Sequence, residues 1–307
     1  MNNLTTVKLE ATETNQPRIE KLIPVPSTDT IYTWSVYVKK GSTDFVALAK
    51  FSGSNNAVFN LANGTLVYET GTLSTSIEAV SDGWYRVSMT VLVYSTDTYN
   101  VLKVTVTDGS SYSSGVIGEY IYLWGAQLEA LSYATSYIPT NGTAVTRGAE
   151  ACYGAGDAST FNSAEGVLFV EIAALSNDLS YRILSLSNGT SNERVYMQYT
   201  NVSNTIAVVV KEDDVTQANM SYVLSDEVAF SKIAIKWKVN DFAMWVNGSE
   251  RATYTSGDTP IGLNSLQFDD GNNSNNFYGK TKQLQVFKTA LTDAELIALT
   301  SWSSFTE

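Results

Sequence analysis

The sequence predicts an all-β protein of two consecutive antiparallel β-sandwich (jelly-roll) domains with a short C-terminal helix. Its 307 residues suit about two domains, each able to bury a core. Short apolar segments with a period of two run through both halves, separated by turn residues. Helical periodicity stands out only at residues 292–299. Strands at this spacing, without helices between them, indicate antiparallel sandwiches.

The pattern divides the chain into four segments. Residues 1–30 are a polar lead-in with two brief alternating stretches, and we expect them to serve attachment. Residues 31–147 form the first sandwich. Residues 148–163 hold many small residues without periodicity and are expected to connect the domains. Residues 164–307 form the second sandwich.

The first clear strand, at residues 31–40, separates its side chains onto two faces. One face carries Tyr32, Trp34, Val36 and Val38, and the other carries Thr33, Ser35, Tyr37 and Lys39. Asn63-Gly64 and Asp82-Gly83 each lie between two later strands. Both dipeptides tolerate the positive φ of a type I′ turn, which predicts two tight hairpins.

Residues 120–139, YIYLWGAQLEALSYATSYIP, are expected to close the first sandwich. Two alternating sets fill the strand, namely Tyr122, Trp124, Ala126 and Leu128 on one side and Ile121, Leu123, Gly125 and Gln127 on the other. Both sets are largely apolar, which predicts a strand covered on both faces. Gly125 lets another group approach closely, and Pro139 ends the run.

The sharpest pattern of the second half is KIAIKWKVNDFAMWVNGS, at residues 232–249. It predicts strands that turn at Asn240-Asp241 and at Asn247-Gly248. Trp237 shares a face with Ile233 and Ile235, so we expect it in the core.

A capping box predicts the start of the C-terminal helix. Thr292 is the expected N-cap, and Glu295 follows three residues later. Leu296 and Leu299 form the apolar stripe of this helix.

Composition excludes several classes of function. The chain has no histidine, which removes the usual general base and the commonest zinc ligand. Its single cysteine, Cys152, excludes an intrachain disulfide framework. The net charge of −12 argues against nucleic acid or an anionic membrane as partner. No secretory signal and no apolar run of bilayer length are visible.

Several sequence segments resemble parts of modules found in bacteriophage structural proteins. The first half resembles the carbohydrate-binding-type jelly roll of phage tail and head-fibre proteins through YTWSVYVKKG, FNLANGTLVYE, SDGWYRVSMT and YLWGAQLEALSYATSYIPTNGTAVTR. The second half resembles a laminin-G-like, concanavalin A-like lectin domain through EGVLFVEI, IAIKWKVNDFAMWVNGS and YGKTKQLQVFKTALTDAELIAL. The first resemblance covers roughly residues 30–147 and the second most of 161–300.

This resemblance implies a phage virion surface protein, either a head fibre, a capsid decoration or a tail fibre component. Such a protein would be made in the host cytoplasm, form a homo-oligomer, contact capsid or tail proteins and adhere to host or mucosal glycans. We expect attachment through residues 1–30 or through the faces of the modules. A purely structural decoration or anchoring protein without a sugar ligand is the alternative. A polysaccharide depolymerase is disfavoured, so no enzymatic activity is expected.

The candidate sugar-binding residues are aromatic and amide side chains, because sugars stack on aromatic rings and bond polar groups at their edges. Trp245 shares a face with Ala243 and Asn247, opposite the apolar set that contains Met244, and is therefore the candidate for an exposed ring. Core packing is the competing interpretation. Trp34, Trp84 and Trp124 are expected in the core. The full candidate set is Trp245, Asn247, Tyr37, Asn276 and Tyr278.

The loop DDGNNSNN, at residues 269–276, is the candidate metal site. Asp269, Asp270, Asn272 and Asn273 supply oxygen atoms of the kind that calcium prefers, and laminin-G-like domains often hold calcium at a loop rim. Asn, Asp and Gly are also ordinary turn residues, which is the alternative. The acidic triplet at residues 212–214 is expected to be a solvated hairpin tip.

Two carboxylates inside strands, Glu129 and Glu171, are the only candidates for glycosidase chemistry. A glycosidase needs a pair of carboxylates on opposite sides of the scissile bond. The sequence places no partner for either residue, so we expect both to have structural roles.

Overall fold

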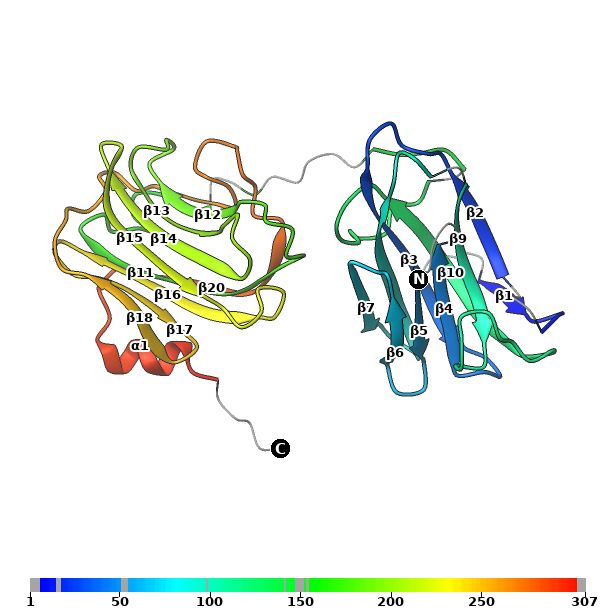
Figure 1. The fold of residues 1–307 in the computed structure, drawn as a ribbon. Coiled ribbons are helices and arrows are strands. Elements are labelled where there is room, and N and C mark those ends of the chain that lie inside the picture. Colours follow the sequence, from blue (N-terminus) through cyan, green and yellow to red (C-terminus); the bar gives the residue numbers. More distant parts are fainter. Residues whose placement is uncertain are drawn as a thin grey trace. The chain divides into compact units, whose positions relative to one another are not determined.

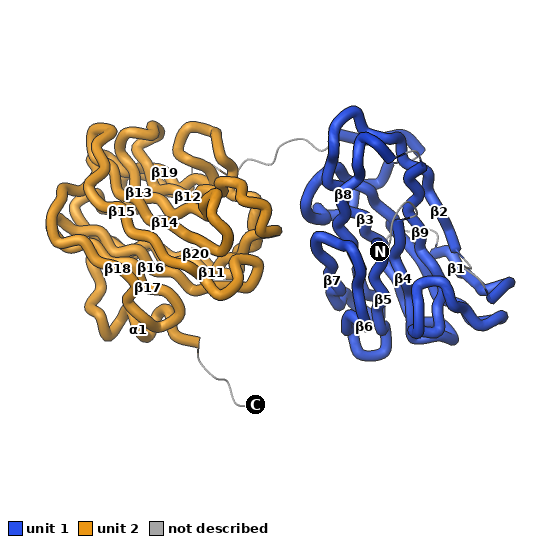
Figure 2. Tube along the Cα trace, in the orientation of Figure 1, with its two compact units in different colours: residues 1–147 blue, residues 148–307 orange. Residues whose placement is uncertain are grey.

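The computed structural model describes residues 6–14, 18–50, 55–97, 99–140, 142–146, 152 and 155–302. The chain divides into two compact units, unit 1 (residues 1–147) and unit 2 (residues 148–307), coloured blue and orange in Figure 2. Each unit consists of two five-stranded antiparallel sheets around an apolar core (Figure 1). One short helix, α1 (Asp293–Thr300), follows the last strand. The expected all-β fold of two antiparallel sandwiches with a C-terminal helix is therefore confirmed.

Unit 1 contains sheets I and II. Sheet I has the strand order β1 (Val7–Glu10), β10 (Tyr120–Glu129), β3 (Thr30–Lys40), β8 (Trp84–Val93) and β7 (Ser74–Ala79). Sheet II has the order β2 (Arg18–Ile23), β9 (Asn100–Thr107), β4 (Phe45–Lys50), β5 (Asn56–Asn60) and β6 (Thr65–Thr70). Strands distant in sequence therefore lie side by side in both sheets.

Residues 1–30, which the sequence analysis set apart as a lead-in, contribute two strands to unit 1. Strand β1 pairs with β10, and β2 pairs with β9, so each forms one edge of a sheet. Ala11 and Ile23 are buried in the core of the unit. Most side chains of both strands are exposed, as is usual at the edge of a sheet. The brief alternation in this segment was the signal for them.

The interior of unit 1 follows the period-two pattern of β3. Trp34, Val36 and Val38 face the core, and Thr33, Ser35 and Tyr37 face outward, as expected. The turn at Asp82-Gly83 has φ values of 55° and 76° and joins β7 to β8, which agrees with a type I′ hairpin. At Asn63-Gly64 only Gly64 has a positive φ, and its N–H donates to the carbonyl of Asn60 over a longer loop, so the type I′ prediction is wrong there.

Strand β10 contains a bulge that the alternating pattern does not show. Trp124 pairs with Tyr37, but the next pair along the ladder joins Gln127 to Ser35, so one extra residue lies in β10. Gly125 supplies the positive φ of 59°. After the bulge, the side chains of β10 lie on the opposite faces from those that strict alternation predicts. Gln127 lies on the outer face with Trp124, and Leu128 packs against the core.

Unit 2 contains sheets III and IV. Sheet III has the order β18 (Ser249–Tyr254), β17 (Phe242–Val246), β16 (Ser231–Lys238), β11 (Glu165–Ala174) and β20 (Gly279–Phe287). Sheet IV has the order β15 (Val215–Val223), β14 (Thr205–Glu212), β13 (Arg194–Tyr199), β12 (Arg182–Ser187) and β19 (Ser265–Gln267). Trp237 is fully buried between the sheets, as expected.

Described residues of the connector also belong to unit 2. Phe161 is buried in the core of this unit. Ala155 forms a bridge with Leu266, and the N–H of Phe268 donates to the carbonyl of Cys152. These three described residues of the connector therefore lie against the sandwich of unit 2.

Helix α1 covers the outer face of sheet III. Its capping box is present, because Thr292 accepts from the N–H of Glu295 and the Glu295 side chain accepts from the N–H of Thr292. Leu296 is fully buried against this face, and Leu299 packs beside it. In the described part of the chain, no helix is long and apolar enough to span a bilayer.

Candidate functional site

Trp245 is not an exposed ring. It lies on the outer face of sheet III, as its alternation implies, but α1 covers that face and leaves only 5% of Trp245 exposed. It packs with Phe169, Ala243 and Leu296. The expectation of a sugar-stacking residue at this position is wrong, because the strand pattern does not reveal which segment covers the face.

Asn247 is exposed at the turn between β17 and β18. Its Oδ1 accepts from the backbone N–H of Lys232 at 2.9 Å and from the indole Nε1–H of Trp302 at 3.2 Å. Asn247 therefore lies beside an exposed tryptophan, although that residue is Trp302 rather than Trp245.

Asn276 and Tyr278 lie next to one another before β20. The Nδ2 of Asn276 donates to the hydroxyl of Tyr278 at 3.1 Å, and Tyr278 is 46% exposed. Tyr278 has a positive φ of 32°, and its neighbour Phe277 is buried. The two residues form a small polar and aromatic edge.

In the candidate calcium loop, the carboxylates accept hydrogen bonds from backbone N–H groups of the loop itself. Asp269 accepts from the N–H of Gly271 at 2.7 Å, and Asp270 accepts from the N–H groups of Asn272 and Ser274. Asp269 is 3% exposed. Within the described ranges, no group of three or more Asp, Glu, Cys or His side chains gathers to hold a metal. This arrangement does not fit the roughly six to eight oxygens that calcium requires.

The same loop is fixed to sheet IV through its carbonyls. Ser185 Oγ donates to the carbonyl of Asp269 at 2.8 Å, and the guanidinium of Arg194 donates to the carbonyl of Asp270. The Arg194 guanidinium also stacks 4.3 Å from the centroid of Tyr196. These contacts tie the loop to sheet IV.

Tyr37 belongs to a cluster of three half-buried aromatic rings on the outer face of sheet I, here called the aromatic cluster (Tyr37, Trp124 and Tyr137). The centroid of Trp124 lies 4.7 Å from that of Tyr37 and 4.7 Å from that of Tyr137. The bulge glycine makes room for both tyrosines, because a Cβ at Gly125 would lie 3.0 Å from Tyr37 Cδ2 and 3.3 Å from Tyr137. The expectation that Gly125 permits close approach is confirmed, whereas Trp124 lies outside the core.

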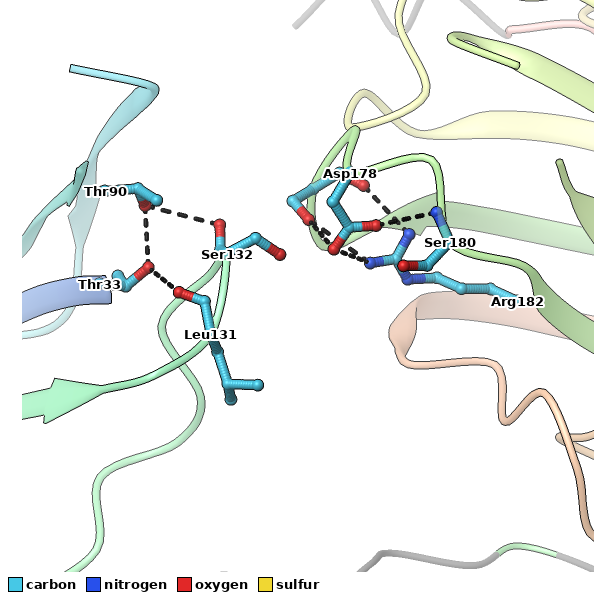
Figure 3. Close-up of polar contacts among 8 residues, drawn as sticks. Thr33, Thr90, Leu131, Ser132, Asp178, Ser180 and Arg182 are labelled. Atoms are coloured by element: carbon cyan, nitrogen blue, oxygen red, sulfur yellow. Dashed lines mark hydrogen bonds and ion pairs between the residues drawn. The ribbon is translucent and has the colours of Figure 1, made fainter. Parts of the chain in front are cut away.

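Tyr137 reaches the cluster because residues 131–138, here called the strap, fold back over sheet I after β10. Thr33 Oγ1 donates to the carbonyl of Leu131 at 2.8 Å and lies 2.9 Å from Thr90 Oγ1 (Figure 3). Thr90 in turn donates to the carbonyl of Ser132 at 3.5 Å (Figure 3). Two buried hydroxyls of the outer face are thereby satisfied by the strap.

Two side chains of β10 hold the rest of the strap. Gln127 Oε1 accepts from the N–H of Ile138 at 2.9 Å, and its Nε2 faces the carbonyls of Thr135 and Ser136 at 3.4 Å. Glu129 accepts from the N–H of Thr135 at 2.9 Å. This confirms a structural role for Glu129 and fixes the position of Tyr137.

Polar groups surround the aromatic cluster. The guanidinium carbon of Arg86 lies 5.4 Å from the centroid of Tyr37, and its Nη2 donates to Ser35 Oγ at 3.0 Å. Farther along β10, a hydrogen bond with Tyr120 raises the pKa of the Tyr122 hydroxyl. An aromatic surface with donors at its edge is the arrangement that sugar stacking needs.

A buried polar group in unit 2 escaped the sequence analysis. Arg182 Nη2 forms an ion pair with Asp178 at 2.8 Å, and Asp178 accepts from the N–H of Ser180 (Figure 3). Nearby, Glu227 is 2% exposed, and burial raises the pKa of its carboxyl despite the attraction of Arg182. Burial and the Glu227 charge also raise the pKa of Tyr199. Glu227 is too deeply buried to reach a polysaccharide.

Glu171 is 8% exposed and forms an ion pair with Lys282 at 3.5 Å, so it also has a structural role. Both of the strand carboxylates considered for glycosidase chemistry, Glu129 and Glu171, are thus engaged in contacts within their own units.

No protein-family model matches the chain, and no curated protein sequence matches it. Among solved structures, the CBM40 module of a Ruminococcus gnavus IT-sialidase is 19% identical, with a TM-score of 0.41, and covers 50% of this chain and 98% of its own. A SAP-like pentraxin from Limulus polyphemus is 12% identical, with a TM-score of 0.40, covering 50% of this chain and 77% of its own. A leech intramolecular trans-sialidase is 18% identical, with a TM-score of 0.37, covering 48% and 24%. None of these three descriptions names a bacteriophage protein.

Proposed function

We propose that this chain is a non-enzymatic surface protein of a bacteriophage virion and that unit 1 contacts glycans through the aromatic cluster. The observation that carries the glycan proposal is the half-buried triplet Tyr37, Trp124 and Tyr137, whose rings pack together on the outer face of sheet I. Large apolar side chains that stay partly exposed and ordered on a sheet are more useful for binding than for stability.

The cluster offers a pyranose ring two kinds of contact. The apolar C–H face of the sugar would stack on an exposed aromatic ring, and the ring hydroxyls would bond the donors at the edge. Arg86, whose guanidinium lies over the ring of Tyr37, is one such donor. The strap keeps the rings in place before binding, so little conformational entropy is lost when a sugar arrives.

The virion assignment rests on the sequence resemblance to phage fibre modules. A fibre or decoration protein present in many copies would turn weak sugar contacts into strong adhesion through avidity. The other outer faces of the units would contact capsid or tail proteins and further copies of the chain.

Two other functions compete with this one. A purely structural decoration protein would use the same sandwiches without any sugar. A depolymerase would need an accessible pair of carboxylates, and Glu129 and Glu171 are instead engaged by the strap and by Lys282. Release of reducing sugar from host capsule by the purified protein would revive the depolymerase.

The test of the proposal is a glycan array screened with the wild-type protein and two variants. We expect at least one glycan to bind, and Trp124→Ala to weaken that binding about tenfold, which corresponds to about 1.4 kcal/mol. Tyr94→Ala is the matched control, because Tyr94 is 48% exposed in the same unit but lies outside the cluster. Thermal melting checks that both variants are folded. Equal binding by Trp124→Ala, or binding by no glycan, would contradict the proposal.

A further inference from the structure

Trp302, at the end of α1, is 51% exposed, whereas Trp237 and Trp245 of the same unit are 0% and 5% exposed. We propose that Trp302, Asn247 and Lys232 form a second sugar-binding site, on unit 2, that stacks a hexopyranose on the indole ring. This inference deepens the proposed glycan-binding function and rests on it.

The exposed indole is held from two sides. The Nζ of Lys232 lies 4.8 Å from the ring centroid, which is a cation–π contact, and also donates to the carbonyl of Ser301 at 3.1 Å. At the ring edge, Nε1–H donates to Asn247 Oδ1 at 3.2 Å. The ring therefore has a defined orientation although about half of it faces solvent.

The turn that carries Asn247 is itself rigid. Asn247 and Gly248 have φ values of 49° and 80°, as in a type I′ hairpin. The N–H of Gly248 donates to Thr300 Oγ1 at 3.1 Å, and a Cβ at Gly248 would lie 2.9 Å from Ser301 Oγ. The hairpin and the end of α1 are thus closely fitted, and a sugar would meet a prearranged surface.

The polar groups around the ring suit a sugar. Asn247 Oδ1 accepts hydrogen bonds from the Lys232 N–H and the Trp302 indole, and within the described part of the chain its Nδ2 makes no hydrogen bond. That amide is a donor at the rim of the ring, at the place where the hydroxyls of a stacked pyranose would project. Lys232 adds a positive charge, so a carboxylated sugar would gain more than a neutral one at low salt.

A purely structural role for Trp302 is the competing explanation, and its exposure argues against it. A tryptophan that serves only to dock a helix is expected to bury its apolar surface, as Trp245 does under the same helix. The indole N–H of Trp302 instead donates to Asn247, and apolar surface of the ring remains exposed to solvent.

The test follows the indole N–H signals of the six tryptophans by NMR in the full chain. The probes are the methyl glycosides of glucose, galactose, N-acetylglucosamine and glucuronic acid. The variants Trp302→Phe and Trp124→Phe assign the two signals of interest. We expect at least one probe to shift the Trp302 signal with a saturable dependence, and Asn247→Asp, which keeps the acceptor and removes the donor, to weaken this binding about tenfold. Tyr254→Ala, exposed on β18, is the matched control and should leave it unchanged.

The outcomes separate the two proposals. A probe that shifts the Trp124 signal but not the Trp302 signal overturns this inference and leaves the proposed function standing. A shift of Trp302 alone, unaffected by Trp124→Ala, supports this inference and removes the site on unit 1. If none of the four probes shifts either signal, both sites are overturned. The shifts of the wild-type tryptophan signals decide between these outcomes, so a variant that fails to fold does not prevent the test of either site.

Discussion

Gly125 and Tyr37 approach so closely that a Cβ on the glycine would lie 3.0 Å from Cδ2 of the tyrosine. The glycine also has a φ of 59°, which an L side chain adopts only with strain. The bulge, the ring of Tyr37 and the strap tyrosine Tyr137 are therefore coupled through one position that tolerates no side chain.

Gly125→Ala should destabilise unit 1 by more than the about 1–2 kcal/mol that a left-handed backbone alone costs an alanine. The excess comes from the contacts with Tyr37 and Tyr137. Gly118→Ala is the control, because Gly118 has a φ of 86° but no atom within 4 Å of its Cβ position. Urea denaturation of both variants measures the difference, and equal losses would show that the aromatic contact is unimportant.

Gln127→Leu should release the second half of the strap. The substitution leaves the N–H of Ile138 without its acceptor, which costs about 1–3 kcal/mol where the group stays buried. We expect faster cleavage within residues 131–138 in limited proteolysis, together with a lower melting temperature. Asn60→Ala removes the side-chain acceptor of the Ala62 N–H in an exposed turn and serves as the control. An unchanged cleavage rate would mean that Gln127 does not hold the strap.

Trp245→Ala should destabilise unit 2 by about 3–5 kcal/mol, because it leaves a cavity beneath α1. Glycan binding by any variant that remains folded should persist, since Trp245 is covered. The measurement is chemical denaturation alongside Tyr254→Ala, whose side chain is 45% exposed and should matter little. A small loss for Trp245→Ala would indicate that α1 does not pack on sheet III in solution.

The buried Glu227 predicts a specific pH dependence. Burial raises the pKa of its carboxyl in the folded state, against the attraction of Arg182 and together with repulsion from Asp178 and Asp226. The folded chain therefore binds this proton more tightly than the unfolded chain. The stabilising contribution is complete below the ordinary glutamate range and is lost as the pH rises through the raised pKa.

Glu227→Gln should consequently be more stable than the wild type at neutral pH, and the advantage should shrink as the pH falls toward about 4. Denaturation at several pH values measures this, with Glu250→Gln, an exposed residue, as the control. An advantage for Glu227→Gln that grows on acidification would reverse the sign and refute the assignment.

Calcium should have little effect on the loop at residues 269–276. Asp269 and Asp270 already accept backbone N–H groups there, and the loop is tied to sheet IV by Ser185 and Arg194. We expect no heat on calcium titration by calorimetry and no change of melting temperature with a chelator. A stoichiometric heat that Asp270→Ala abolishes would establish a calcium site that this loop conformation does not display.

Features that depend on residues close together in the sequence were predictable, whereas contacts between residues far apart in the sequence were not. The faces of β3, the turns at Asp82-Gly83 and Asn247-Gly248, and the capping box of α1 were all predictable, because each depends on neighbouring residues. The same reasoning placed Trp245 on the correct face of its strand. It did not show that the face is buried.

The all-β class, the alternation of the strands, the tight turns and the start of the helix could be predicted from the residue order, since they follow from backbone geometry and local polarity. Three contacts could not be predicted in this way: α1 covers Trp245, the strap brings Tyr137 onto Trp124, and Trp302 donates to Asn247. Each of these contacts joins segments whose patterns are independent of one another. A hydrophobic pattern shows which face of a helix or strand is apolar. Packing between segments distant in sequence determines what covers that face and which side chains remain exposed to bind a ligand.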